Sequence, residues 1–257
     1  MKLPFLISIP HGGTVIPFEI RDKVGLSKHD LFNDSDAFTR EIYDVEDMVA
    51  FQIKANIARA FVDLNRPTDA LPPEFPDGVV KSLTCYNKPV YNNSSVLSKE
   101  ETQVLLKKYY QPYHKKIQKA LENPEIILGL DCHSMATVAP NIAPDTGQQR
   151  PLINLGNVDG QAASNEVTSI LKSCFVKIFE LPEHEVIINW PFKGGHITRT
   201  YGNKPKPWIQ IEINRNLYLN APWFELESLQ INRDRIQELN RKFRQVLRQF
   251  ANQIARK

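Results

Sequence analysis

The sequence predicts an α/β fold with three layers, in which helices cover both faces of a mostly parallel or mixed sheet. Short apolar runs alternate along the chain with segments whose apolar residues recur at helical spacing, and this alternation is typical of β-α-β units. The length of 257 residues and the 42% share of hydrophobic residues allow one large buried core. We therefore expect a single domain over residues 1–257.

Five apolar runs are expected to form the strands of the sheet. They cover residues 5–9, 57–62, 126–130, 186–188 and 208–213. Short, continuous apolar runs of this kind are typical of strands that are buried on both faces.

Three segments show the features of helices. Ser98-Lys-Glu-Glu101 is a capping box that begins the first helix, and Pro112 is expected to bend or break that helix. Residues 164–180 carry apolar side chains at helical spacing. The last 25 residues are expected to form a helix whose apolar stripe packs on the body of the protein while its Lys and Arg residues face water.

The charge, the apolar runs and the cysteines do not indicate a nucleic-acid-binding, membrane-spanning, secreted or disulfide-rich protein. Subtracting 29 Asp+Glu from 32 Lys+Arg gives a formal net charge of +3, an excess too small to indicate nucleic-acid binding. No apolar run approaches the roughly 18 residues that a membrane span requires. The apolar run near the N-terminus is shorter than that of a secretory signal peptide, and three widely spaced cysteines do not indicate a disulfide framework. We therefore expect a cytoplasmic protein without nucleic-acid or membrane partners.

Two histidines follow predicted strands. His11 comes after the run 5–9 and His133 after the run 126–130, at the edge where open α/β sheets place their ligand sites. Catalytic zinc usually takes three protein ligands from histidines and carboxylates. The pair therefore indicates a divalent metal site, with Zn²⁺ as the expected ion, although each histidine alone is also consistent with a hydrogen-bonded packing residue.

The third ligand is left open between two aspartates. Asp34 and Asp36 precede an amphipathic segment, so each is a candidate ligand, and each could instead cap a helix that starts there. Asp131 shares a strand face with His133, two residues away, and could either bind the metal or orient the histidine.

Glu212 and several basic residues are candidates for catalysis and substrate binding. Glu212 lies in an apolar strand, where a carboxylate needs a partner or a function. It could be a general acid–base beside a metal, or an ion-pair partner of Arg215 or another arginine. Guanidinium groups suit anionic substrates because they bind both oxygens of a carboxylate, although each could form a structural ion pair instead. The candidate substrate-binding residues are Arg66, His196, Arg199 and Arg215.

Six short motifs occur in an order that resembles the N-formylglutamate amidohydrolase family, from about residue 5 to residue 220. The motifs are Ile-Ser-Ile-Pro-His11-Gly-Gly, Asp34-Ser-Asp36, Ala58-Arg-Ala-Phe-Val-Asp-Leu-Asn-Arg66, Leu130-Asp-Cys-His133-Ser-Met135, Gly194-Gly-His-Ile-Thr-Arg199-Thr-Tyr-Gly202 and Gln210-Ile-Glu212. Each motif is short, but six in this order are specific.

The resemblance implies a phosphorylase/hydrolase-like fold related to the zinc carboxypeptidases, and a divalent metal that is expected to be zinc. By position, His11, one of Asp34 and Asp36, and His133 would hold the metal. Glu212 would be the acid–base residue, and the segment with Arg199 would lie near the substrate carboxylates. The family reaction converts N-formyl-L-glutamate and water to formate and L-glutamate, the last step of one histidine-degradation route, so the expected partner is a small anionic N-acyl amino acid.

Two other functions fit parts of the same pattern. One is a zinc peptidase or cell-wall-type amidase on a related fold, although the lack of a recognisable signal peptide does not favour a periplasmic enzyme. The other is a non-enzymatic protein that binds acidic metabolites through its arginines.

Overall fold

The protein, seen in a computed structural model that describes residues 2–92 and 96–255, is built on a six-stranded sheet. Its strands lie in the order β2-β1-β3-β6-β4-β5. The first four are parallel neighbours, β4 runs antiparallel to β6, and β5 is parallel to β4. The bounds are β1 (Leu3–Ile9), β2 (Val49–Lys54), β3 (Leu128–Met135), β4 (Ile153–Gly156), β5 (Val186–Ile188) and β6 (Trp208–Asn214), with a separate ribbon of β7 (Phe224–Glu225) and β8 (Gln230–Ile231).

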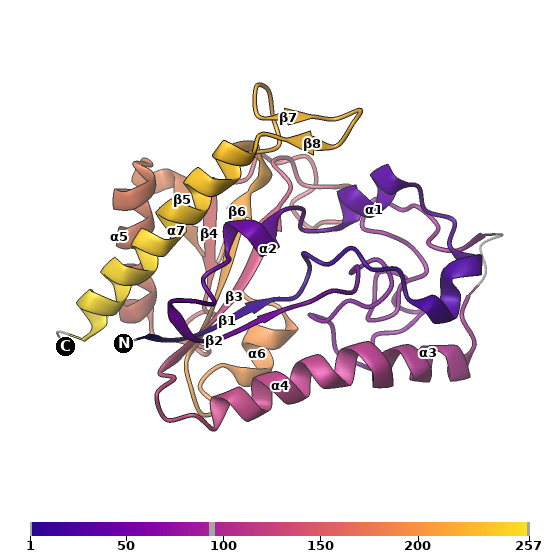
Figure 1. The fold of residues 1–257 in the computed structure, drawn as a ribbon, viewed down its shortest axis with the longest axis horizontal. Coiled ribbons are helices and arrows are strands. Elements are labelled where there is room, and N and C mark those ends of the chain that lie inside the picture. The colour runs from indigo at the N-terminus through magenta and orange to yellow at the C-terminus, as the bar shows by residue number, and fades with distance from the viewer. Residues whose placement is uncertain (1, 93–95, 256–257) are drawn as a thin grey trace.

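Helices cover both faces of the sheet, which confirms the predicted three-layer α/β fold (Figure 1). On one face α5 (Asn165–Phe179) packs against α7 (Arg233–Ile254), and on the other lie α4 (Gln111–Leu121) and α6 (His196–Tyr201). The described residues also form three short α-helices, α1 (Lys28–Asp34), α2 (Thr39–Ile42) and α3 (Lys99–Leu105), and 3₁₀ helices at Phe18–Lys23, Glu183–Glu185 and Arg215–Leu217.

Strand alternation divides the core into two layers. Ile7, Leu130 and Ile211 face the layer formed with α5 and α7, whereas Leu6 and Trp208 belong to the layer beneath α4. Gly129 lies directly against the indole of Trp208, because a Cβ built there would come 2.3 Å from the ring. The glycine thus lets a large aromatic ring lie flat against the centre of the sheet.

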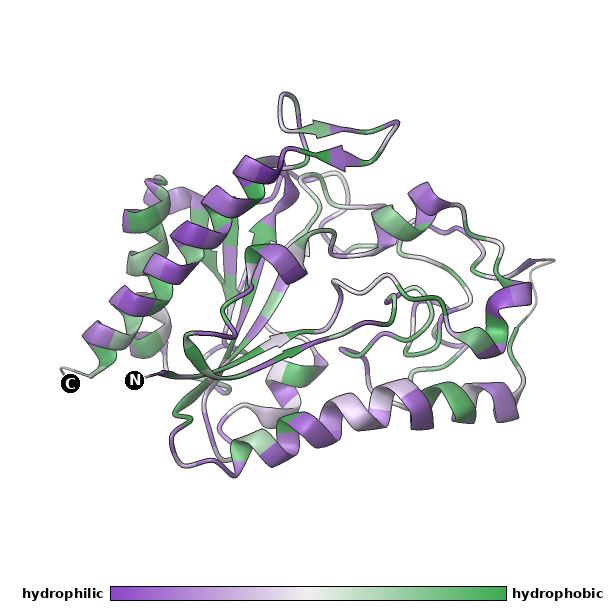
Figure 2. Ribbon diagram, in the orientation of Figure 1, coloured by the Kyte–Doolittle hydropathy of each residue, from purple (hydrophilic) through white to green (hydrophobic). Residues whose placement is uncertain are grey.

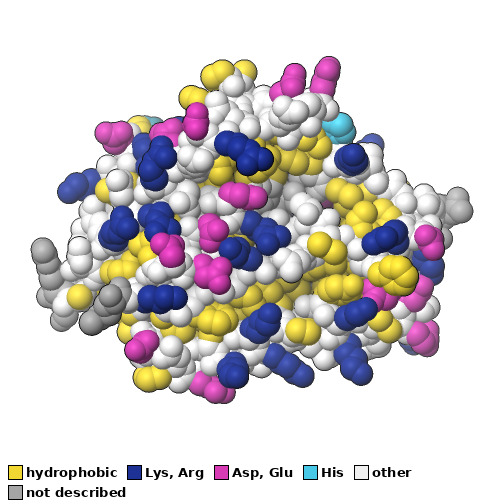
Figure 3. All heavy atoms as spheres, in the orientation of Figure 1, with side chains coloured by type: hydrophobic (Ala, Val, Ile, Leu, Met, Phe, Trp, Pro, Cys, Tyr) yellow, Lys and Arg dark blue, Asp and Glu magenta, His cyan; other side chains and the backbone are white. Residues whose placement is uncertain are grey.

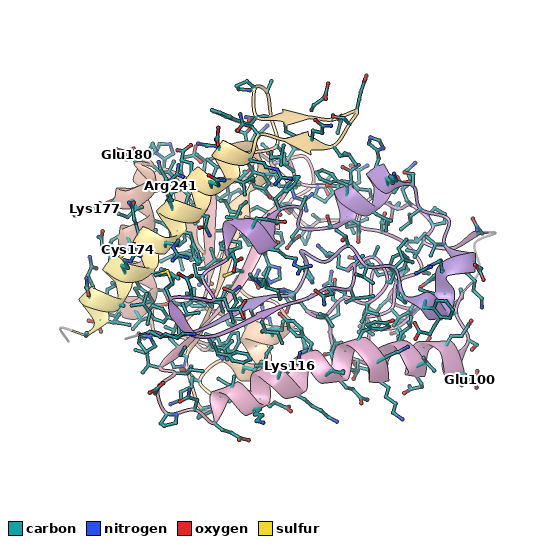
Figure 4. The ribbon with its side chains drawn as sticks, viewed as in Figure 1. Glu100, Lys116, Cys174, Lys177, Glu180 and Arg241 are labelled. Atoms are coloured by element: carbon teal, nitrogen blue, oxygen red, sulfur yellow. The ribbon has the colours of Figure 1, made fainter. Side chains whose placement is uncertain are left out.

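The predicted helices at 164–180 and at the C-terminus are α5 and α7. Ser164 caps α5 by accepting a hydrogen bond from Val167 N–H. Hydrophobic and hydrophilic residues alternate along α7 (Figure 2), and its apolar stripe is buried. Basic and acidic side chains are interspersed on the face shown in Figure 3, which fits a solvated surface. All three cysteines are free, and Cys174 lies on α5 beside α7 (Figure 4).

The predicted irregularity near Pro112 is a π-helical turn. The capping box of Ser98 and Glu101 begins α3 as expected, and residues Leu106–Tyr110 then form the π-helical turn that leads into α4. Proline lacks an N–H and crowds the carbonyl four residues earlier, so a wider turn before it lets the helix continue.

Two strand predictions are wrong or incomplete. The run 57–62 is not a strand: after a single bridge at Ile57 it forms turns, and its side chains fill the core as Ala58, Phe61 and Val62. The strand beside β1 is β2 instead. The run 126–130 overlaps only the start of β3, which begins at Leu128 and continues through His133 to Met135, and β4 lies outside all the predicted strands. Within the described ranges, no helix is long and apolar enough to span a membrane.

Candidate active site

The two predicted histidines meet at one edge of the sheet. His11 follows β1 by two residues, and His133 lies in the neighbouring strand β3, close to its carboxyl end. Their rings are buried, and their Nδ1 atoms lie 3.1 Å apart. Because parallel strands end at the same edge, residues 122 positions apart become direct neighbours.

Asp36 completes a group of three possible ligands. Its Oδ2 lies 3.1 Å from Nδ1 of His133 and 3.5 Å from Nδ1 of His11. A tetrahedral zinc ion with bonds of about 2.0–2.1 Å separates its ligand atoms by roughly 3.3 Å. The three donor atoms therefore have the spacing that one divalent cation requires, and together they form a possible metal site.

The other nitrogen of each ring faces a carboxylate. Nε2 of His11 lies 2.7 Å from Oδ1 of Asp63, and Nε2 of His133 lies 3.0 Å from Oδ2 of Asp131. A carboxylate at Nε2 favours a proton on that atom and leaves a lone pair on Nδ1. Two lone pairs facing each other across 3.1 Å repel unless a proton or a metal cation lies between them, so the donor set is one that a metal can fit.

Asp36 is held in this orientation from several sides. The backbone N–H of Ser134 donates to its Oδ2, and the guanidinium groups of Arg59 and Arg215 each lie 3.5 Å from its Oδ1. Oδ2 is thereby directed at the histidines while the two arginines compensate its buried charge.

Asp34 has a different environment. It is the last residue of α1, and its Oδ2 lies 3.1 Å from the Nζ atom of Lys81, which is fully buried. Burial raises its pKa, but Lys81 and Arg59 outweigh burial and lower the pKa to about 2. Neither Asp34 nor Asp36 caps α2, which has no side-chain cap.

Glu212 lies opposite His133 in the pairing of β3 with β6. Its Oε1 accepts a hydrogen bond of 2.7 Å from Nε2 of Gln210, whose Oε1 in turn accepts the backbone N–H of Gly195. Burial raises the pKa of Glu212 to about 7, although nearby His133 acts in the opposite direction. Among the described residues, Arg215 pairs with Asp36, and no ion pair between Arg215 and Glu212 forms.

A cavity of about 610 Å³ opens over these residues. A larger groove of about 790 Å³ lies between α2 and α7, and it has no lining residue in common with this cavity. The histidines, Asp36 and Glu212 all line the smaller cavity. The basic residues that line the smaller cavity are Arg59, Arg66, Arg150, Lys193, Arg199 and Arg215. The same lining contains the carboxylates of Asp36, Asp63, Asp77 and Glu212, and the excess of cations over carboxylates suits an anionic molecule.

The predicted substrate-binding residues differ in how many of their N–H groups already form hydrogen bonds within the protein. Arg199 is exposed and donates from Nε to the carbonyl of Gly194, and Arg66 pairs with Asp77 at 3.0 Å. Arg215 donates to Ser134 Oγ, to two backbone carbonyls and to Asp36. His196 does not line the described cavity.

Several residues of the site were not singled out from the sequence. Asp63 holds His11, Gln210 holds Glu212, and Arg150 stands in the cavity wall. Arg150 pairs with Asp145 through Nε and Nη2 and lies 4.8 Å above the ring of Phe192. Segment 58–67 contains several polar residues, which is a sequence feature that indicates Asp63 as a candidate. Arg150 follows no predicted strand, and no sequence feature marks it as a site residue.

Fold and site together define an α/β enzyme of hydrolytic type, with a buried carboxylate beside convergent histidines in a basic cavity. The chain belongs to the N-formylglutamate amidohydrolase family, whose model matches residues 3–219.

Two relatives are similar to this chain in sequence, and one solved structure is similar to it in fold. The N-formylglutamate deformylase of Pseudomonas putida is 28% identical over 227 residues, which cover 85% of this chain and 82% of the relative. The enzyme of the same name from Pseudomonas aeruginosa is 27% identical over 228 residues, or 85% of this chain and 83% of the relative. The crystal structure of an N-formylglutamate amidohydrolase from Ralstonia eutropha JMP134 superposes with a TM-score of 0.82 at 21% identity, covering 99% of this chain and 95% of the other.

Proposed function

We propose that the protein hydrolyses the amide bond of N-formyl-L-glutamate and releases formate and L-glutamate. The observation that carries the proposal is the convergence of Nδ1 of His11, Oδ2 of Asp36 and Nδ1 of His133 beside Glu212, in a cavity lined by arginines. The deformylase relatives, at 27–28% identity over most of the chain, support the choice of substrate.

His11, Asp36 and His133 would hold a divalent cation, for which we propose Zn²⁺. Two neutral imidazoles and one carboxylate are a ligand set of the kind that catalytic zinc uses. When bound, such a cation polarises a carbonyl oxygen and lowers the pKa of water. The carboxylates of Asp63 and Asp131 would keep both imidazoles in the tautomer that offers Nδ1.

Glu212 would move the protons. As a carboxylate it takes a proton from the attacking water, and as a carboxylic acid it gives that proton to the leaving amino nitrogen. A pKa of about 7 suits both of these proton transfers near neutral pH. The hydrogen bond from Gln210 occupies Oε1 of Glu212 and leaves Oε2 for this exchange.

Arg66 and Arg199 would bind the carboxylates of the substrate. Both line the cavity, and both retain guanidinium N–H groups beyond those that bind Asp77 and Gly194. Arg215, with most of its N–H groups already donated, would chiefly keep Asp36 in place.

The test is formate release from N-formyl-L-glutamate compared with N-formyl-L-glutamine, which has nearly the same shape but lacks the side-chain charge. A hydrogen bond to a charged group contributes about 1.5–3 kcal/mol, so kcat/KM should be roughly 10- to 100-fold higher for the glutamate compound. Absence of formate, or release of amino acids from peptides instead, would exclude the proposed reaction. Equal rates with the two compounds would exclude selection of the carboxylate by arginine.

A further inference from the structure

A row of buried polar side chains runs from His133 away from the cavity towards α4. Ser8 on β1 is paired with Asp131 on β3, and its Oγ donates a 2.9 Å hydrogen bond to Oδ1 of Asp131. The hydroxyl of Tyr113 on α4 lies 3.0 Å from the same Oγ. Ser8 and Asp131 are fully buried and Tyr113 is 5% exposed, so water does not offer them alternative partners.

The hydrogen bonds of this row can point in only one direction. An ionised Asp131 accepts hydrogen bonds and donates none, so the single hydroxyl proton of Ser8 is used on Asp131. Tyr113 must therefore donate to Ser8. Burial raises the pKa of Tyr113 well above its ordinary value, which keeps the phenol protonated and able to donate.

The row ends at the histidine that faces the cavity. With Oδ1 of Asp131 occupied by Ser8, Oδ2 lies in charge contact with Nε2 of His133 at 3.0 Å and accepts no hydrogen bond within the described part of the chain. The amide nitrogen of Asn65 also lies 3.1 Å from Nε2 and would favour the opposite tautomer, with the proton on Nδ1. Asp131 and Asn65 therefore compete for Nε2, and a carboxylate held close to the ring favours the tautomer that keeps the lone pair on Nδ1.

We propose that Ser8 and Tyr113 are positioning residues of the metal centre, acting through Asp131 on His133. In this relay Tyr113 orients the hydroxyl of Ser8, Ser8 fixes the carboxylate, and the carboxylate holds the proton on Nε2, so that Nδ1 is free to bind a cation. The inference rests on the proposed metal site. It assigns a function to two hydroxyl groups that lie outside the cavity and cannot touch the substrate.

The test measures Zn²⁺ affinity by competition with a chromogenic chelator. Removing a direct partner of a metal ligand costs about 10- to 100-fold, so Ser8→Ala, which acts one step further out through Asp131, should weaken binding by up to about 10-fold, and Tyr113→Phe should weaken it in the same direction. Tyr91→Phe is the matched control, because Tyr91 is a buried tyrosine whose hydroxyl has no hydrogen-bond partner among the described residues. Its affinity should equal that of the unmodified protein.

The double variant separates a relay from two independent effects. In a relay Tyr113 acts on the metal site through Ser8, so Ser8→Ala with Tyr113→Phe should bind Zn²⁺ about as tightly as Ser8→Ala alone, whereas additive losses would contradict the relay. The visible absorption bands of the Co²⁺-loaded protein, which report ligand geometry, should shift in Ser8→Ala and not in Tyr91→Phe.

Two failures can be told apart. If the unmodified protein binds no Zn²⁺, the proposed metal site fails, and the relay fails with it. If the unmodified protein binds Zn²⁺ and the two folded relay variants match it, only the relay is overturned. Thermal unfolding of the metal-free proteins establishes folding, and Tyr113→Phe alone tests the relay if Ser8→Ala does not fold.

Discussion

The most informative substitutions compare Asp34 with Asp36, two aspartates separated by one residue. Each is changed to asparagine, which keeps the shape and removes the charge. Asp36 directs Oδ2 at the two histidines, whereas Asp34 is paired with Lys81 behind the site. We expect Asp36→Asn to abolish tight metal binding and Asp34→Asn to reduce stability while leaving the metal in place.

The size of the stability effect follows from the pKa of Asp34. Its fall from 3.8 to about 2 is about 1.8 pKa units, equivalent to about 2 kcal/mol in favour of the folded protein at neutral pH. Because the folded-state pKa is depressed, this contribution is present above about pH 4 and is lost as pH falls through about 2. Asn at position 34 can still accept the N–H of Cys85, and Lys81 keeps Asp77 at 2.6 Å.

The assay combines urea unfolding of the metal-free proteins with Zn²⁺ titration. Asp34→Asn should lose about 2 kcal/mol of unfolding free energy at pH 7 and keep its Zn²⁺ affinity within a few-fold. Asp36→Asn should lose more than about 100-fold in affinity, because removing an outer partner of a ligand already costs 10- to 100-fold. The reverse pattern, with Asp34→Asn losing the metal and Asp36→Asn keeping it, would refute the assignment of Asp36.

Three further predictions concern catalysis, binding and packing. Glu212→Gln should keep Zn²⁺ but lose about 10²- to 10⁴-fold in kcat. The fall of kcat/KM towards low pH that protonation of Glu212 causes should disappear in this variant, and unchanged turnover would speak against an acid–base role. Arg199→Gln should raise KM for N-formyl-L-glutamate roughly 10-fold or more in steady-state kinetics, with little change for an uncharged N-formyl amino acid. Gly129→Ala should destabilise the protein by about 1–3 kcal/mol in urea unfolding, since its Cβ would meet Trp208 at 2.3 Å, and a neutral effect would contradict the packing.

Much of the site can be predicted from local sequence because its candidate ligands and acid–base residue lie in strands or directly after them. His11 and His133 each follow or end an apolar run, and parallel strands bring such positions to one edge of the sheet. The alternation of β3 places Asp131 with His133 and turns Cys132 towards the opposite core, as the two-residue period predicts. Glu212 was recognisable because a carboxylate is out of place in an apolar strand.

The remaining features depend on contacts between distant segments. Asp34 and Asp36 are equivalent in a local pattern, and contacts with distant residues separate their environments: buried Lys81, 47 residues away, pairs with Asp34, whereas the N–H of Ser134 binds Asp36. The run 57–62 has strand composition, yet the position beside β1 is filled by the less apolar β2, and the run packs as turns in the core. The π-helical turn before α4, the pairing of Asp63 with His11 and the place of Arg150 depend on tertiary packing in the same way.

The central claim is that a cation held by His11, Asp36 and His133 is required for hydrolysis of N-formyl-L-glutamate. The most direct test follows formate release by the purified protein before chelation, after removal of metal by a chelator, and after adding back one equivalent of Zn²⁺. We expect activity to be lost with the metal and to return with Zn²⁺, and His133→Ala to remain inactive at the same Zn²⁺ concentration. Formate release that persists unchanged in protein shown to be free of metal would contradict the claim.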